Sequence, residues 1–452
     1  MLARSSRRVG ATALRCGARG LATGSEGERP WAKALDEETF GRLRTLLAAP
    51  SPVGLEGAMT QGVLEPRLRE IIPSAWKVHK FRSQAAMVVD TDPKASDDKL
   101  TVMVVGHADK IRMQVKKIAN DGKVFIDSDS HLALTLLGRD VAIFSEDAET
   151  PGEYRVIRGG TVEALGAIHF AEANIRTGQR GIKAEQLYVE LGIHGKNKKK
   201  QVTEGLGLRP GDSIIMEKPI RRGVGCNTFT GAYLDNGLGC WVAAEACEQM
   251  AQDPAFAETL EKVRVLFAFA THEEIGRFGS RVLAQTFKPD VLIAVDVNHD
   301  YVAAPGIASK QMPDLAMGEG PTLSVGSITS AHLNATIQRA ARRADIPLQI
   351  DVVGRDTGTD AMAGVLASVD AASTSIGIPI RNMHTVSETG CTDDLVAATH
   401  LFVETVRELG RQEADGVAFA HPNLTDAKEI TSIPAHLFDD EDADGEDSKS
   451  DN

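Results

Sequence analysis

The chain has 452 residues, of which 42% are hydrophobic and 25% charged, and its formal net charge is −13. This composition is typical of a globular protein with one large domain and a smaller one. It argues against a nucleic-acid partner, because the sequence has no basic patch interleaved with aromatic residues, and against a membrane partner, because no apolar run reaches about 18 residues.

The N-terminal segment, residues 1–30, has the pattern of a targeting sequence. Its first 25 residues contain five arginines and no acidic residue. On a helix these arginines fall within one sector, and Leu2, Val9 and Ala13 lie near the opposite side. We therefore predict a mitochondrial presequence and a location in the mitochondrial matrix. The alternatives are a plastid transit peptide and a plain basic tail on a cytoplasmic protein.

The central part of the chain alternates apolar strands with amphipathic helices. The predicted helices are 36–47, 57–71, 238–250, 330–344 and 394–409, and the predicted strands are 86–89, 100–105, 263–270, 291–297 and 373–378. Several of these strands are continuously apolar, which is typical of strands covered on both faces. The sequence therefore predicts an α/β fold, a doubly wound mixed sheet with helices on both faces.

Residues 116–223 differ from this pattern. Their short strands are separated by turns at 120–122, 158–160 and 210–212, which predicts a small β-rich domain inserted between 31–115 and 224–415, the two parts of the larger domain. A lysine-rich run at 196–200 is predicted to be a solvated loop. The extension at 416–452 ends in an acidic tail that we expect to be disordered.

Seven histidines and acids follow the predicted strands or open a helix. They are His107 and Asp109 after 102–105, Glu273 and Glu274 after 265–270, Asp296 after 291–295, His384 after 373–378, and Asp235 at the start of a helix. Each has an ordinary structural explanation, such as a helix cap or a solvated surface pair. Ligands of open α/β sheets bind outside the carboxyl ends of the strands, so their joint placement there favours a functional site.

These residue types indicate a metal site. Imidazole nitrogens and carboxylate oxygens bind zinc and similar ions, whereas the five cysteines include no Cys-x-x-Cys pair. Two ions about 3.5–4 Å apart need one bridging carboxylate and roughly one histidine and one further carboxylate each. The set that meets this count is His107, Asp235, Glu274, Asp296 and His384. Glu273 is then free to accept a proton from a water molecule, and Asp109 could hold the second nitrogen of His107.

Six motifs, taken together and in order, resemble metallopeptidase family forty-two, the TET-type aminopeptidases, some of whose members are also named glutamyl aminopeptidase or endoglucanase. They are Val-Gly-His-Ala-Asp at 105–109, Leu-Asp-Asn at 234–236, His-Glu-Glu-Ile-Gly at 272–276, Ala-Val-Asp-Val at 294–297, Gly-Thr-Asp-Ala at 358–361, and Ile-Gly-Ile-Pro-Ile-Arg-Asn-Met-His at 376–384. With the inserted domain, the resemblance covers about residues 36–410.

The resemblance implies a role for each site residue. Asp235 would bridge two metal ions, and the peptide bond between Asp235 and Asn236 would be cis. The remaining ligands would be Glu274 with His384 at one ion, and His107 with Asp296 at the other. Glu273 would be the general base, and Asp109 would orient His107.

The resemblance also implies an assembly. The inserted domain of the family mediates dimerisation, and six dimers can build a tetrahedral particle of twelve subunits. Two positions depart from the family, which often has an acid where this chain has Lys110 and an arginine where it has Gly237. Both departures leave the ligands in place, and they bear on the electrostatics beside the metals and on the packing around Asp235.

The expected function is therefore that of a dinuclear metal aminopeptidase acting on short peptides. Two divalent ions would be its cofactors, zinc first, although cobalt and manganese also suit these ligands. The alternatives are a non-peptide metallohydrolase such as a deacylase, a glycoside hydrolase with Glu273 and Asp296 as its carboxylate pair, and a metal-stabilised assembly protein without catalysis. A glycoside hydrolase would leave His107 and His384 without a role.

Overall fold

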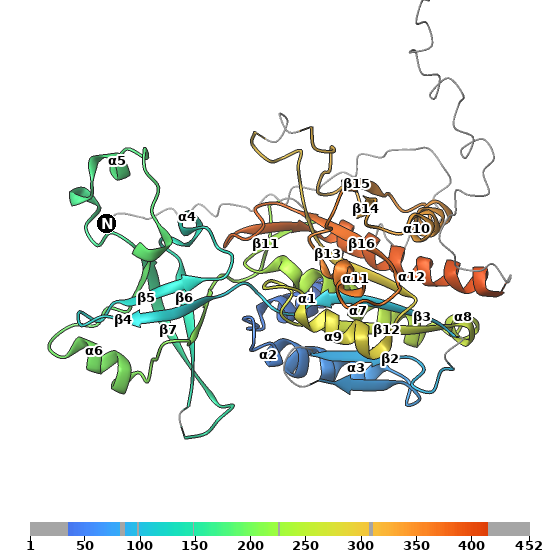
Figure 1. Cartoon of the computed structure of the whole chain (residues 1–452), viewed down its shortest axis with the longest axis horizontal. Coiled ribbons are helices and arrows are strands. Elements are labelled where there is room, and N and C mark those ends of the chain that lie inside the picture. Colours follow the sequence, from blue (N-terminus) through green and yellow to red (C-terminus); the bar gives the residue numbers. More distant parts are fainter. Residues whose placement is uncertain are drawn as a thin grey trace, which may run out of the picture.

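The protein has two parts, a larger one of helices and a sheet and a smaller one made mostly of strands (Figure 1). The structure is a computed structural model, and it describes residues 35–414 apart from 82–85, 97–98, 148, 225–226 and 307–310. The predicted presequence at 1–30 and the predicted extension at 416–452 lie outside the described residues. Among the helices that are described, none is long and apolar enough to cross a membrane.

The larger part is organised around an eight-stranded mixed sheet. In sheet order the strands are β1 (Lys77–Lys80), β2 (Met87–Asp90), β12 (Val263–Ala270), β3 (Leu100–His107), β13 (Val291–His299), β16 (Ala372–Ile380), β14 (Thr322–Gly326) and β15 (Gln349–Val353). The central strands β12, β3, β13 and β16 run parallel, whereas β2 and β14 are antiparallel to their central neighbours. The five predicted strands are present, and their ends shift by at most two residues.

Helices cover both faces of this sheet. Successive side chains of a strand point to opposite faces, so the two faces form separate apolar clusters. In β3, Val102 and Val104 belong to one apolar cluster, and Met103 and Val105 belong to another. The first cluster includes residues of α1 (Glu37–Ala48), α2 (Gly57–Met59), α3 (Glu65–Ile71), α7 (Leu234–Gln252), α8 (Phe256–Lys262), α10 (Ala331–Arg343) and α12 (Thr392–Ala414), and the second includes residues of α9 (Phe278–Phe287) and α11 (Ala363–Leu366). The predicted doubly wound sheet is confirmed.

The smaller part is a closed six-stranded barrel with its own apolar core. Around the barrel the strands are β4 (Met113–Ile118), β5 (Val124–Ser128), β8 (Tyr188–Glu190), β7 (Tyr154–Glu163), β6 (Asp140–Glu146) and β9 (Ser213–Met216). The short helices α4 (Ala133–Leu136) and α5 (Ala173–Arg176) lie between these strands in the chain. A separate three-stranded sheet contains β10 (Arg221–Arg222), β11 (Thr228–Gly231) and β17 (Glu388–Cys391). The barrel strands thus span Met113–Met216, whereas the predicted insert spans 116–223.

The last three lysines of the run form a helical turn, so the predicted loop at 196–200 is wrong at 198–200. Asn197 has a left-handed backbone, with φ of 55°, and α6 (Lys198–Lys200) follows it directly. The side-chain amide of Gln201 donates to the carbonyl oxygens of His194 and Lys196, which holds the chain at the start of this turn. The lysines nevertheless lie largely at the surface, as predicted.

Two glycines allow helix α7 to lie directly against the strands that carry the site. A Cβ atom added to Gly106 of β3 would lie 2.5 Å from the carbonyl carbon of Gly239 in α7. A Cβ added to Gly239 would overlap the carbonyl oxygen of Val295 in β13. This close approach places the first turn of α7, with Asp235, next to the ends of β3 and β13.

We predict that Gly239→Ala destabilises the protein by about 1–3 kcal/mol, because the added methyl group forces α7 away from β13. Urea denaturation measured without metal would test this. Gly41→Ala is the matched control, since no described atom lies within 4 Å of its added Cβ and alanine favours the interior of helix α1. Equal stability of the two variants would contradict the prediction.

Candidate metal centre

The structure brings all seven predicted site residues to the carboxyl end of the central strands. His107 ends β3, with Asp109 two residues beyond, and Asp296 lies in the second half of β13. The remaining four are Glu273 and Glu274 in the turn after β12, His384 after β16, and Asp235 in the first turn of α7. Parallel strands end at the same edge of a sheet, which explains how residues so distant in sequence converge.

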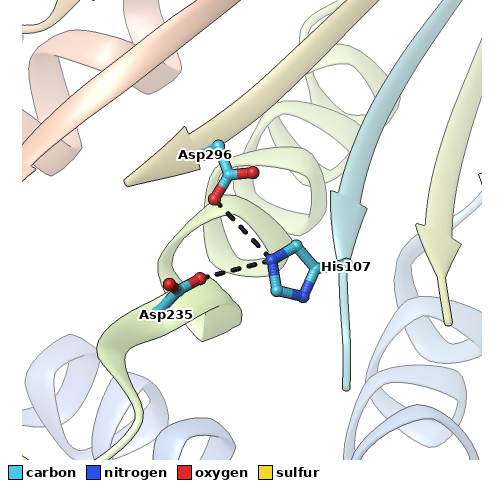
Figure 2. Close-up of side chains that lie close together, drawn as sticks. All are labelled: His107, Asp235 and Asp296. Carbon is cyan, nitrogen blue, oxygen red and sulfur yellow. Dashed lines mark ion pairs between the residues drawn. The ribbon is translucent and has the colours of Figure 1, made fainter. Parts of the chain in front are cut away.

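The first candidate ligand group consists of His107, Asp235 and Asp296. Their side chains point toward one another from three different elements (Figure 2). Nε2 of His107 lies 3.2 Å from Oδ1 of Asp235 and 3.7 Å from Oδ1 of Asp296. One ligand atom from each residue falls within 4.8 Å of the others, so the three could hold one ion.

The second group consists of Asp235, Glu274 and His384, and it meets the same 4.8 Å criterion. Nε2 of His384 lies 3.1 Å from Oδ2 of Asp235 and 3.6 Å from Oε2 of Glu274. Asp235 therefore belongs to both groups, with Oδ1 facing one histidine and Oδ2 the other. The peptide bond between Asp235 and Asn236 is cis, as the resemblance implies.

The acids of the two groups repel one another. Burial raises the pKa of Asp296 and of Glu274 well above the usual range, and the Asp235 carboxylate adds to the rise. Burial lowers the pKa of His107, but the carboxylates around it, Asp296 first, outweigh burial and raise that pKa. Burial raises the pKa of Asp235, but its contacts with the imidazole groups of His107 and His384 outweigh burial and hold this pKa below its usual range. Added positive charge would relieve this repulsion.

Two orphaned oxygens show that the residues fit divalent cations. Among the described residues, Oδ1 of Asp235 and Oε1 of Glu274 have no hydrogen-bond partner although both atoms are buried. An unsatisfied buried polar atom costs about 1–3 kcal/mol, and more when it is charged. Oxygen and imidazole donors suit zinc and related ions, and a cation at each group would satisfy both atoms.

Glu273 and Asp109 lie beside these groups. Oε2 of Glu273 is 3.8 Å from Nε2 of His107, and burial raises the pKa of Glu273 to about 7. Nδ1 of His107 lies 3.1 Å from the main-chain oxygen of Asp109 and 3.5 Å from its carboxylate. That carboxylate accepts hydrogen bonds from the backbone N–H groups of Glu273 and Glu274, at 3.1 and 3.2 Å. Asp109 thus fixes the Glu-Glu turn as well as contacting His107.

A cavity of about 640 Å³ opens onto both groups. Besides the site residues, its walls include His299, Tyr301 and Met312 and much of the segment 351–359. The cavity therefore gives a ligand access to the two histidines and to Glu273.

Comparison with known proteins identifies the family. A family model described as M42 glutamyl aminopeptidase matches residues 87–401, which is more than half of the chain and includes all seven site residues. The chain belongs to the M42 peptidases. It is thus a metallopeptidase of a family of aminopeptidases, and the family implies divalent metal ions.

Relatives of this M42 peptidase are similar over most of their length. The lysyl aminopeptidase of Pyrococcus furiosus is 26% identical over 347 residues, which cover 76% of this chain and 90% of the relative. The glutamyl aminopeptidase of Lactococcus lactis is 24% identical over 368 residues, with 80% and 94% covered. A TET aminopeptidase from a marine sediment archaeon of the Thaumarchaeota shares the fold, with a TM-score of 0.71, 21% identity, and 84% and 99% of the two chains covered.

Sequence reasoning misses Glu388, a buried acid at the start of β17 that holds two segments with candidate ligands, those of Asp235 and His384. Its Oε2 accepts from the backbone N–H groups of Leu234 and Asp235, and its Oε1 accepts from the N–H of His384. His384 and Tyr233 both have left-handed backbones, with φ of 60° and 62°. Such backbones persist where the surroundings fix them, and Glu388 supplies that support. Its only sequence signal is its place four residues after His384.

Asp360 is a second missed acid. It belongs to the recognised motif at 358–361, but no role followed from that resemblance. The side chain is buried and accepts a hydrogen bond from the Ser280 hydroxyl. After burial itself, its negative charge is the strongest influence that raises the pKa of Glu273.

Lys110 and Gly237, the two positions at which the resemblance implies other residues, both lie against the end of helix α1. Nζ of Lys110 donates to the carbonyl oxygens of Leu47 and Ala49, at 2.8 and 2.6 Å, and burial lowers its pKa to about 7. A Cβ atom added to Gly237 would lie 2.5 Å from Cδ2 of Leu47. An arginine at position 237 would therefore overlap Leu47. Lys110 and Gly237 therefore both pack against the end of α1.

We predict that Glu388→Gln weakens the site. Glutamine has one acceptor oxygen, so it can hold either the Leu234–Asp235 backbone or that of His384, but not both. Leaving buried N–H groups without an acceptor costs about 1–3 kcal/mol, which urea denaturation of the metal-free protein would measure. Glu258→Gln on the exposed side of α8 is the control. The same stability for both variants would show that Glu388 has no such role.

Proposed function

We propose that this M42 peptidase is an aminopeptidase with a dinuclear metal site. The observation that carries the proposal is the position of Asp235, whose two carboxylate oxygens face different histidines. His107 and Asp296 would hold one ion, and Glu274 and His384 the other. Divalent ions bound there would supply Lewis-acid chemistry for hydrolysis, and zinc, cobalt and manganese all suit these donors.

Glu273 is the general base in this proposal. It belongs to neither ligand group, yet Oε2 lies 3.8 Å from His107, at the edge of the cavity. From there it can accept the proton of the attacking water and deliver it to the leaving amine. Asp109 holds the Glu273–Glu274 turn through its carboxylate and His107 through its main-chain oxygen.

Short peptides are the proposed substrates. The cavity of about 640 Å³ has room for the end of a peptide rather than for a folded chain. The two curated relatives described above are named for different residues, lysine and glutamate. A panel of substrates that differ only in the N-terminal residue would therefore establish the preference of this chain.

We predict that Glu273→Gln lowers kcat by about 10²–10⁴-fold, because an amide cannot accept the proton. Its bound metal, measured by elemental analysis, should equal that of the unaltered protein. The adjacent variant Glu274→Gln is the matched comparison, and it should lose metal together with activity. A chelator should abolish the release of N-terminal residues, and added zinc, cobalt or manganese should restore it.

Other outcomes would favour the rival functions. Activity that is insensitive to chelator, or absent across the peptide panel, would rule out the proposed aminopeptidase. Chelator-sensitive cleavage of acylated amines, but not of peptides, would indicate a deacylase. Glu273→Gln without any effect would indicate a metal-stabilised assembly protein.

We also propose that the inserted domain at 116–223 forms a homodimer and that dimers assemble into dodecamers. The structure of PhTET1-12s is a dodecamer, and Pyrococcus horikoshii TET1 can assemble into a tetrahedron or a large octahedral shell, each at 19% identity and a TM-score of 0.63. In this chain Leu134 is 79% exposed and Phe170 is 91% exposed, which leaves apolar surface for a second subunit.

Light scattering would test this assembly, since the chain mass is 48.3 kDa. We predict a mass that is a multiple of the dimer, and smaller particles after Leu134→Asp combined with Phe170→Asp. Lys199→Asp at the exposed α6 serves as the control. A monomeric unaltered protein would contradict the proposal.

The mitochondrial matrix is the proposed location. The five arginines within the first 25 residues support it. Residues 1–30 fused to a fluorescent reporter should direct it to mitochondria, and changing the five arginines to glutamine should abolish import. Delivery to plastids, or a diffuse signal from the unaltered fusion, would contradict this proposal.

A further inference from the structure

Arg277 lies at the start of helix α9, four residues after Glu273. Its backbone N–H donates to the carbonyl oxygen of Glu273 at 3.0 Å, which closes the turn between β12 and α9. The residue precedes α9 directly, and its φ of 59° is left-handed. This conformation is disfavoured for any residue with a side chain other than a short polar one.

The side chain of Arg277 makes no hydrogen bond that caps helix α9. Helix starts favour serine, threonine, aspartate or asparagine, because their oxygens accept a backbone N–H. A guanidinium group has no acceptor and cannot make this bond. A long cation held in a left-handed backbone at this position therefore calls for another explanation.

The guanidinium group instead joins Glu273 to Asp356, an acid on the cavity wall. Its Nε lies 3.3 Å from Oε1 of Glu273, and its Nη1 lies 3.1 Å from Oδ2 of Asp356. Arg277 is only 19% exposed, whereas Asp356 is 53% exposed and lies on the cavity wall. The arginine thus ties the Glu273 carboxylate to the segment that borders the cavity.

The two oxygens of Glu273 consequently have different surroundings. Oε1 is held by Arg277 from outside the ligand groups, and Oε2 lies 3.8 Å from Nε2 of His107. A charge-assisted hydrogen bond to one oxygen restrains rotation of the carboxylate and keeps the other oxygen turned toward the metal ligands.

We propose that Arg277 is a positioning residue for the hydrolytic reaction, which holds Oε1 of Glu273 so that Oε2 receives the proton. The inference rests on the proposed function, in which Glu273 is the general base. Asp356 fixes the guanidinium group from the other side and couples it to the cavity wall. Misplacement of a reacting group by about 1 Å can cost 10²-fold in rate, so loss of Arg277 should be visible in kcat.

The test uses the full chain with bound metal and a short peptide substrate. Arg277→Met should lower kcat about 10–100-fold, with KM within about twofold and metal content unchanged. Arg281→Met, one turn further along α9, is the matched control and should keep full activity. In Asp356→Asn, Arg277 keeps its contact with Glu273, so this variant should lower kcat by a smaller factor than Arg277→Met.

A double-variant comparison separates positioning from a merely structural role. When Glu273 is already glutamine, Arg277→Met should lower the residual rate by less than about twofold, because there is no carboxylate left to position. A structural role would instead lower the rate by the same factor in both backgrounds, which would overturn the inference. Arg277→Lys keeps the positive charge and should fold normally. A lysine ammonium group cannot bridge Glu273 and Asp356 as the planar guanidinium group does, so this variant should still lose most of the activity.

The inference and the proposed function fail in different ways. If the unaltered protein shows no chelator-sensitive release of N-terminal residues, the proposed function fails. If that release is present but kcat of both Arg277→Met and Arg277→Lys stays within about twofold, the function stands and the positioning role is overturned. A fall in metal content that accounts for the whole loss of activity would also overturn it.

Discussion

The mutual repulsion of buried acids around Asp235 is the constraint on which the site depends. Burial raises the pKa of both Asp296 and Glu274, and the charge of Asp235 adds to each rise. Folding nevertheless brings them to within 4.8 Å of histidine nitrogens on either side of Asp235. Such a cluster is costly without cations and favourable with them, so the peptidase fold and its metal ions are coupled.

The surrounding structure holds this repulsive cluster together. Gly106 and Gly239 let α7 approach the strands closely enough to place Asp235 between the two histidines. Acids outside the ligand groups then fix the backbone: Asp109 binds the Glu273–Glu274 turn, and Glu388 binds the segments that carry Asp235 and His384. Partners of this kind orient metal ligands and raise metal affinity in other proteins.

Residues that act through the backbone were harder to predict than the ligands. Most of the candidate ligands lie in or just after apolar strands, and the strand pattern can be read from β3, β12 and β13 directly. Glu388 follows His384 by four residues without any such pattern, and its role depends on the pairing of β17 with β11. The helical turn at Lys198–Lys200 also has no local pattern that predicts it, and the Gln201 side chain donates hydrogen bonds to the backbone just before it.

The sequence by itself determined the class of fold, five of the eight strands of the sheet, and the residue types that reach its carboxyl edge. These follow from local hydrophobic periodicity and from the donor chemistry of histidine and carboxylate. Only the tertiary structure decided that each oxygen of Asp235 faces its own histidine, and that Lys110 and Gly237 both accommodate the end of α1. Distances between side chains depend on how separate elements pack, and no local pattern in the sequence records that packing.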